Sequence, residues 1–224
     1  MFKGASPFSD YVDAEFLTAV GISLIVLLGI TVVMIWFVIR YSRKRNPHPS
    51  NIHGNTTLEV LWTVIPLGIF LYIFYIGWEG YEKTIDVPEG ALPIRVTARM
   101  WVWTFEYPNG VQTDTLYVPA NTPMKLTLHS MDVNHSLFIP AFRIKKDVIP
   151  NRENVMWFKT PYPASYDIAC AEYCGLRHSY MYSKVVAKDS ARFEQWYQEI
   201  SRKQAKPYTP MLVLNPATNE ITTQ

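Results

Sequence analysis

The sequence predicts a two-helix transmembrane hairpin followed by an all-β domain, a short C-terminal helix and an extended tail. Three features predict this fold: two long uncharged apolar runs in the first 80 residues, short β-branched and aromatic segments from position 92 onward, and one amphipathic helical pattern before a polar end. We therefore divide the chain into residues 1–80, which hold an N-terminal segment and the hairpin, residues 81–204, which form the outer domain with its C-terminal helix, and a tail over residues 205–224.

The two apolar runs cover residues 17–39 and 60–78, and neither contains a charged residue. At about 1.5 Å per residue the first run is roughly 35 Å long, which is enough to cross a hydrocarbon core of about 30 Å. Pro66 lies inside the second run, where it is tolerated in a membrane helix and predicts a kink. The alternative, two helices buried in a soluble protein, is disfavoured because uncharged runs of this length are rare there.

Charges flanking the first run predict its orientation. Residues 40–45 carry four cations, whereas residues 1–16 carry Lys3 against three acids. The positive-inside rule therefore places the loop of residues 40–58 in the cytoplasm and both termini outside. The domain from about Tyr81 onward then lies in the periplasm or its equivalent. No small-residue cleavage site is recognisable, so we expect the first helix to be a permanent anchor.

Short strands are predicted throughout the outer domain. The stretch IRVTARMWVWTFEYP is rich in β-branched and aromatic residues, and PNG at 108–110 is typical of a hairpin turn. Further strand candidates are residues 113–118, 124–130, 135–140, 153–159, 164–169 and 181–187. Many short strands without an intervening helical pattern favour a β-sandwich or a barrel.

The end of the chain contains a helix and then a polar segment. One face of the helix is formed by residues at helical spacing, namely Phe193, Trp196, Tyr197 and Ile200. From Lys206 the sequence is polar and contains prolines, so we expect an extended tail. The chain has no repeat, no phosphate-binding glycine loop and no C-x-x-C-H motif for covalent haem, and we expect no nucleic-acid partner.

Both cysteines of the chain lie in IACAEYCGLRHSYM, residues 168–181. Cys170, Cys174, His178 and Met181 follow one another at spacings of four, four and three, which suits ligands on one loop. A second imidazole could come from one of two upstream histidines, His129 and His135. We favour His135, because DVNHSLFIP begins a new strand beside the loop, whereas His129 lies inside a strand pattern.

This donor set is soft and therefore favours copper over hard divalent ions. The second cysteine is best explained by two thiolates that bridge two copper ions, each of which also takes one imidazole. Met181 and a backbone carbonyl would occupy the two axial positions. Two alternatives remain. A Cys170–Cys174 disulfide suits the outer compartment but leaves His178 and Met181 unexplained, and a tetrahedral zinc site gives no role to Met181.

The segment CAEYCGLRHSYM resembles the binuclear copper loop C-x-E-x-C-G-x-x-H-x-x-M of cytochrome c oxidase subunit II. DVNHSLFIP with KKDVIPNR, MWVWTFEYP and LEVLWTVIP resemble other segments of that family, so the likeness covers roughly residues 15–200. The resemblance implies a cupredoxin-like sandwich. It also implies copper ligands, namely His135, Cys170, Cys174, His178, Met181 and the backbone carbonyl of Glu172.

The resemblance implies three further roles. The Glu172 side chain would help to bind magnesium at the contact with subunit I, and Trp101 would be the residue at which electrons enter. Glu59 would lie at the mouth of a proton-uptake path on the inner side. Simpler readings remain for two of them. Trp101 and Trp103 would share one face of a strand and could be core residues, and Glu59 could serve only the dipole of its helix.

The function implied is that of the electron-accepting subunit of a haem-copper terminal oxidase. A c-type cytochrome or a haem domain would donate electrons, which pass to haem in subunit I for oxygen reduction coupled to proton pumping. This chain would supply no catalytic residue for the oxygen chemistry. We expect contacts with subunit I, other oxidase subunits and the lipid bilayer, in a bacterial plasma membrane rather than a mitochondrial one. The alternatives are the copper subunit of a membrane nitric oxide reductase and a membrane-anchored copper-binding protein.

The sequence departs from the family pattern at three positions. Arg143 and Asn151 stand where glycine is usual, and Phe138 stands where the family often has tryptophan. In addition, residues 83–204 carry 15 Lys and Arg against 12 Asp and Glu, a formal charge of +3. Because opposite charges steer encounter, we expect a donor less basic than usual, or a haem domain held in a larger assembly.

Overall fold

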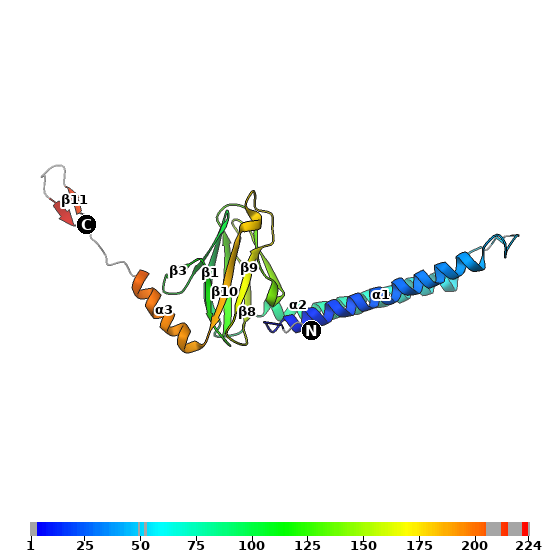
Figure 1. The fold of residues 1–224 in the computed structure, drawn as a ribbon, viewed down its shortest axis with the longest axis horizontal. Coiled ribbons are helices and arrows are strands. Elements are labelled where there is room, and N and C mark those ends of the chain that lie inside the picture. Colours follow the sequence, from blue (N-terminus) through cyan, green and yellow to red (C-terminus); the bar gives the residue numbers. More distant parts are fainter. Residues whose placement is uncertain (1–3, 49, 52, 205–211, 215–220, 224) are drawn as a thin grey trace.

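A long helical hairpin projects from one end of a β-sandwich (Figure 1). The computed structural model describes residues 4–48, 50–51, 53–204, 212–214 and 221–223. The hairpin consists of α1, Ser9–Arg40, and α2, Thr56–Ile85. A short helix, α3, Ser190–Gln204, follows the sandwich.

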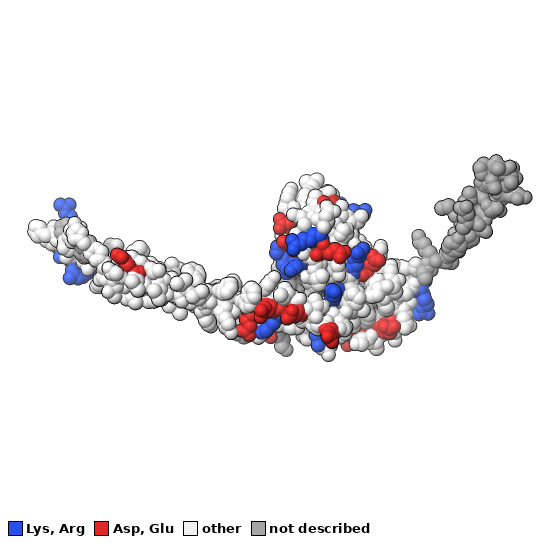
Figure 2. Space-filling view, turned by 180° about the vertical axis from the view of Figure 1, so that it is seen from behind, with Lys and Arg blue, Asp and Glu red and all other residues white. Residues whose placement is uncertain are grey.

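Both hairpin helices extend the predicted apolar runs by several polar residues. Their apolar windows have no buried residues, so these side chains are available to lipid or to other subunits. The surface of the hairpin is accordingly mostly white in Figure 2, with cations gathered at its far end. The side chain of Asn55 caps α2 by accepting a hydrogen bond from the Leu58 amide at 3.2 Å. The helix continues without interruption through Pro66.

The outer domain is a sandwich of two five-stranded sheets. The first has the order β3-β2-β1-β5-β8, with β3 at Gln112–Thr113, β2 at Val102–Glu106, β1 at Leu92–Arg99, β5 at Pro123–Ser130 and β8 at Asn154–Lys159. The second has the order β4-β10-β9-β6-β7, with β4 at Leu116–Pro119, β10 at Tyr182–Lys188, β9 at Ser165–Cys170, β6 at His135–Ile139 and β7 at Ile144–Val148. The pairs β1–β5 and β4–β10 are parallel, and the other pairs are antiparallel.

Alternation of side chains builds the core between the sheets. In β5 the buried residues are Met124, Leu126, Leu128 and Ser130, and the residues between them are half-buried. This pattern confirms the predicted sandwich.

The structure differs from the predicted strand pattern at three places. The β-like stretch IRVTARMWVWTFEYP contains two antiparallel strands, β1 and β2, because the chain reverses at Met100 and Trp101. The predicted strand 113–118 splits at Asp114 into β3 and β4, which belong to different sheets. The strand β7 was not predicted because its sequence IKKDV is highly charged, as is common for a strand at a sheet edge.

The predicted amphipathic face of α3 packs on the sandwich. Phe193 is buried, and Trp196, Tyr197 and Ile200 pack against the core. Trp196 also meets Tyr107 edge-on, with ring centroids 5.4 Å apart. Most of the predicted tail lies outside the described residues. Within it, β11, Leu212–Leu214, pairs in antiparallel fashion with β12, Ile221–Thr223.

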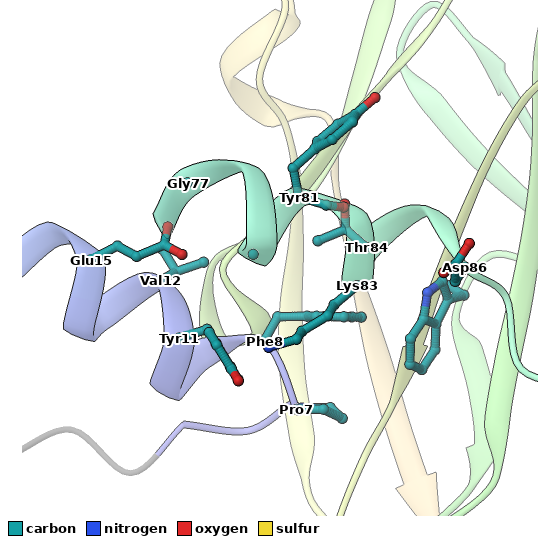
Figure 3. A pocket seen from close by; sticks show the side chains of 12 residues that line it. Pro7, Phe8, Tyr11, Val12, Glu15, Gly77, Tyr81, Lys83, Thr84 and Asp86 are labelled. Carbon is teal, nitrogen blue, oxygen red and sulfur yellow. The ribbon is translucent and has the colours of Figure 1, made fainter. Parts of the chain in front are cut away.

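The segment before α1 joins the hairpin to the sandwich. The Ser6 hydroxyl donates a 2.8 Å hydrogen bond to the Phe142 carbonyl, and Phe8 packs edge-on against Trp157. A cavity of about 590 Å³ with a mainly apolar lining is lined by residues from the beginning of α1 and the end of α2. Figure 3 shows Lys83 beside Tyr11 in this cavity, with its ammonium 3.6 Å from the ring centroid.

Both unusual substitutions for glycine have left-handed backbone conformations. Arg143 has a φ of 58° at the end of the 3₁₀ turn η1, Pro140–Phe142, and Asn151 has a φ of 59°. Glycine adopts this region without steric cost. Arg143 compensates with its side chain, because its Nε donates a 2.8 Å hydrogen bond to the Asp13 carboxylate on α1.

Replacing Arg143 in two ways should separate the backbone and side-chain effects. Arg143→Gly and Arg143→Ala both remove the ion pair with Asp13, but only alanine retains the left-handed strain. We therefore expect the free energy of unfolding of Arg143→Gly to exceed that of Arg143→Ala by about 1 kcal/mol. Thermal unfolding of the full chain in detergent measures this difference. An alanine variant as stable as the glycine variant would contradict the explanation.

Candidate metal centre

The cysteine loop connects two neighbouring strands at one end of the sandwich. Cys170 is the last residue of β9, and its antiparallel neighbour β10 begins at Tyr182, which pairs with Ala169. The loop folds back on its base because the Cys170 amide donates to the Met181 carbonyl at 3.2 Å. A 3₁₀ turn, η2, His178–Tyr180, lies inside the loop. The closed loop therefore brings donor residues that are separated in sequence close together in space.

Strand β6 supplies the second imidazole. Leu137 of β6 pairs with Cys170 of β9, and His135 lies two residues earlier on the same face of β6. The His135 side chain is fully buried, and its Nδ1 is 3.8 Å from the Cys170 Sγ. His129 instead lies in β5 of the other sheet, opposite Thr97. The preference for His135 over His129 therefore agrees with the geometry.

The predicted donor atoms form one chain of short contacts. The two Sγ atoms are 3.8 Å apart, and the Glu172 carbonyl lies 3.3 Å from the Cys170 Sγ. On the other side, the Cys174 Sγ is 3.5 Å from the His178 Nδ1 and 3.8 Å from the Met181 Sδ. Cys170, Cys174 and Met181 are buried, and His178 is half-buried. These contacts link all six predicted donor residues, and the donor atoms of His135, Cys170 and Cys174 all lie within 4.8 Å of one another.

The sulfur geometry fits a metal better than a disulfide. Both cysteines are free thiols, and 3.8 Å greatly exceeds the roughly 2.05 Å of an S–S bond. Two metal–thiolate bonds of about 2.3 Å can span the observed separation, so a single ion could contact both sulfurs. The thioether of Met181 belongs to the same cluster, which suits copper better than zinc.

The pKa values of the two thiols are shifted in opposite directions. Burial disfavours a thiolate at Cys170, but hydrogen bonding to His135 and to the backbone of Ser136 outweighs burial and lowers the pKa of Cys170. Burial and the adjacent charge of Cys170 raise the pKa of Cys174. Because two neighbouring thiolates repel each other, a cation between them would favour ionisation of both.

Asp132 is a functional candidate that sequence reasoning missed. Its carboxylate is 2.8 Å from the His135 Nε2, and it accepts 2.7 Å hydrogen bonds from the amides of Met100 and Val133. The contact with Nε2 leaves Nδ1 directed at the cysteines and orients the ring. The spacing D-x-x-H could have suggested this pairing, but only the turn at Met100 shows that Asp132 also holds the Trp101 segment.

We expect removal of this carboxylate to weaken copper binding. Asp132→Ala should lower copper affinity about 10–100-fold, because the His135 ring loses its orienting partner. The affinity of Asp132→Asn should lie between those of Asp132→Ala and the original chain. Competition with a copper chelator on the full chain in detergent measures the change. Asp167→Asn, an exposed acid on β9, is the matched control. An Asp132→Ala affinity within twofold of the original chain would refute this role.

Both tryptophans contact the cysteine loop. The prediction that they share one face of a strand was wrong. Trp101 lies in the turn between β1 and β2 rather than on a strand face shared with Trp103. Its indole N–H donates to the Cys174 carbonyl at 3.2 Å, and the ring is half-buried. Gly175 has a φ of 109°, a backbone conformation that glycine adopts without steric cost and other residues rarely adopt. Glycine therefore allows the loop conformation that places Cys174 beside Trp101.

Trp103 is the second contact that sequence reasoning missed. It is buried, its N–H donates to the Met181 carbonyl at 3.4 Å, and its ring lies 6.1 Å from that of His135. The alternation in β2 predicted only that it belongs to the core.

Glu172 and Glu59, the two acids with predicted roles, lie in different parts of the molecule. The Glu172 side chain is exposed on the loop, although its carbonyl faces Cys170. Glu59 is exposed in the first turn of α2, at the opposite end of the hairpin from the sandwich.

Comparisons with known proteins agree with the motif. Residues 110–188 match the family model described as cytochrome c oxidase subunit II, periplasmic domain, and residues 1–77 match the transmembrane domain of the same subunit. The chain belongs to the cytochrome c oxidase subunit II family. This family implies a copper centre, and family membership together with α1 and α2 supports a two-pass membrane protein.

Relatives resemble both halves of the molecule. Cytochrome c oxidase subunit 2 of Alkalihalophilus pseudofirmus is 31% identical over 200 residues, covering 84% of this chain but only 58% of that protein. The Synechocystis subunit is 27% identical over 242 residues, covering 86% of this chain and 73% of that protein. The crystal structure of the periplasmic domain of subunit II of cytochrome oxidase from Bradyrhizobium japonicum superposes with a TM-score of 0.52 at 28% identity, covering 54% of this chain and all of that one.

Proposed function

We propose that this subunit II chain receives electrons at a binuclear copper centre and passes them to haem in subunit I of a haem-copper terminal oxidase. The observation that supports this most strongly is the cluster of two thiols, two imidazoles and one thioether at the end of the sandwich. Oxygen reduction coupled to proton pumping takes place in the partner subunit.

The protein contributes fixed geometry to this centre. His135, Cys170, Cys174, His178, Met181 and the Glu172 carbonyl hold the metal, which supplies one-electron redox chemistry when bound. Strand pairing and the contact of Trp103 with the Met181 carbonyl fix the base of the loop, and the contact of Trp101 with the Cys174 carbonyl fixes its middle. Burial of the sulfurs excludes water. A rigid, dry donor set changes little between oxidation states, which favours rapid electron transfer.

Trp101 is the residue at which electrons enter. It combines partial exposure with a hydrogen bond to the Cys174 carbonyl, so its ring links the surface to a thiolate ligand through few atoms. The donor is a c-type cytochrome or a haem domain.

The two acids serve contacts with the rest of the oxidase. The exposed Glu172 side chain binds magnesium at the boundary with subunit I, while its carbonyl faces copper. Glu59 lies at the mouth of the proton-uptake path on the inner side of the membrane. Both chain termini lie outside, in a bacterial plasma membrane, as the cations of residues 40–45 favour.

Gas consumption by the purified complex that contains this chain tests the assignment. With ascorbate and a small redox mediator as electron source, we expect oxygen uptake that is inhibited by cyanide. The mediator makes this assay independent of any cytochrome. Reduction of nitric oxide without oxygen uptake would instead assign the chain to a nitric oxide reductase.

A further inference from the structure

The cavity at the junction of the hairpin and the sandwich has the size of a ligand site. Its volume of about 590 Å³ falls within the roughly 300–1,000 Å³ that is usual for small-molecule sites. Its lining is mainly apolar and comes from the beginning of α1, the end of α2 and Trp157 of β8. The cavity is partly open to its surroundings, and its lining residues Tyr11 and Tyr81 are 45% and 53% exposed.

This cavity lies at the depth of lipid headgroups. The second uncharged run ends at Trp78, beside the lining residue Gly77, and Lys83 follows roughly 7.5 Å farther along α2. Each headgroup layer is about 5–8 Å thick, because a bilayer of about 40–45 Å has a hydrocarbon core of about 30 Å. On the hydrocarbon side of the cavity, Phe16 and Phe74 are each 65% exposed. Apolar surface therefore continues from the cavity into the hydrocarbon core.

The lining carries charges of both signs. Its one cation is Lys83, whose ammonium lies over the Tyr11 ring and 3.4 Å from the Glu79 carboxylate on the same helix. Its two acids are Glu15 and Asp86, and neither forms an ion pair with any residue that the structure describes. Figure 3 shows these two acids and Lys83 at separate places around the cavity. A ligand that carries one charge of each sign matches this lining better than an anion does.

We propose that the cavity binds the headgroup of a zwitterionic phospholipid, such as phosphatidylethanolamine, from the surrounding bilayer. The lipid phosphate contacts Lys83, whose pair with Glu79 is exposed and therefore weak enough to be displaced. The lipid ammonium is attracted by Glu15 and Asp86. The acyl chains leave the cavity along the exposed apolar surface of the hairpin. This proposal depends on the membrane-spanning hairpin and not on the copper centre.

An anionic phospholipid such as phosphatidylglycerol fits the same lining less well. Its phosphate can also contact Lys83, but its headgroup has no ammonium. It therefore meets Glu15 and Asp86 as uncompensated like charges, which disfavours binding. The sign of the headgroup charge thus distinguishes this site from a general attraction of lipid to an apolar surface.

Gly77 offers a way to block the cavity without changing its charges. A Cβ built on Gly77 has no atom within 4 Å, so a larger side chain can enter free space there. Gly68 lies on the same helix with equally open surroundings, but it does not line the cavity. Gly77→Leu is therefore the blocking variant, and Gly68→Leu is its matched control.

Native mass spectrometry of the purified full chain in non-ionic detergent tests the proposal. The probes are phosphatidylethanolamine and phosphatidylglycerol, each titrated separately. We expect one phosphatidylethanolamine to bind per chain, at least about fivefold more tightly than phosphatidylglycerol. Gly77→Leu should weaken phosphatidylethanolamine binding at least about tenfold, whereas Gly68→Leu should change it less than about twofold.

The ratio of the two affinities tests the role of charge. Glu15→Gln/Asp86→Asn leaves Lys83 as the one charged side chain of the lining, so the ratio should shift at least about fivefold toward phosphatidylglycerol. Asp167→Asn/Glu194→Gln removes two exposed acids outside the cavity and should leave the ratio unchanged. The ratio is the readout because general damage to the fold would lower both affinities together.

Equal affinity for the two lipids would overturn the proposal, as would a Gly77→Leu chain that binds phosphatidylethanolamine as tightly as Gly68→Leu does. Lipid analysis of the assembled oxidase extends the test, because a segment of another subunit could fill the same cavity. Complexes with the original chain should carry one more phosphatidylethanolamine than complexes with Gly77→Leu. Equal lipid content in the two complexes would mean that another subunit occupies the cavity and would also overturn the proposal.

Discussion

Replacing Cys174 with serine is expected to abolish the binuclear centre. The Cys174 Sγ contacts three other donor atoms, namely those of Cys170, His178 and Met181, so a hard hydroxyl there disrupts the whole cluster. Changes to residues beyond the ligands already cost about 10–100-fold in metal affinity, so loss of this ligand should cost more than about 100-fold. Copper content should fall by at least half, and mediator-driven oxygen uptake should fall more than about 100-fold.

Elemental analysis and oxygen uptake on the same purified complex measure both effects. Ser179→Ala provides a control in the same loop, since Ser179 is exposed and contributes no donor to the cluster. Full copper content and normal uptake in Cys174→Ser would show that this sulfur is not a bridging ligand.

Replacing Trp101 with leucine is expected to slow electron transfer from a cytochrome while copper is retained. Leucine fills part of the volume but lacks both the aromatic ring and the N–H that donates to the Cys174 carbonyl. We expect cytochrome-driven turnover to fall at least about tenfold, equivalent to about 1.4 kcal/mol in the barrier. Copper content should remain that of the original chain, because Trp101 contributes no ligand.

A second substitution distinguishes the ring from its hydrogen bond. Trp101→Phe keeps an aromatic ring without the N–H, so its turnover should lie between those of leucine and tryptophan. Flash-induced oxidation of a bound cytochrome measures the step directly. If Trp101→Leu transferred electrons at the original rate with intact copper, Trp101 would be a packing residue only.

Local spacing was sufficient to predict most of the candidate centre. Cys170, Cys174, His178 and Met181 lie on one loop, so their separation in sequence limits their separation in space. His135 could be added because it begins a strand, although only the pairing of Leu137 with Cys170 shows how its ring reaches the sulfurs. The hairpin was predictable because composition alone makes long uncharged helices recognisable.

Features that depend on chain reversal or on backbone conformation could not be predicted. The turn at Met100 and Trp101 lies within a continuous β-like pattern, so the position of Trp101 and its contact with Cys174 were not evident. Asp132 acquires its role only when this turn approaches His135. Likewise, the replacement of glycine by Arg143 is understood only from its left-handed backbone and its partner on α1.

Electron paramagnetic resonance combined with metal analysis tests the central claim most directly. On the purified, metal-replete chain, we expect copper pairs that share a single unpaired spin, with hyperfine structure from both nuclei. A spectrum of isolated copper(II) ions at one ion per chain would contradict it. So would a chain that takes up no copper because its two cysteines are joined in a disulfide.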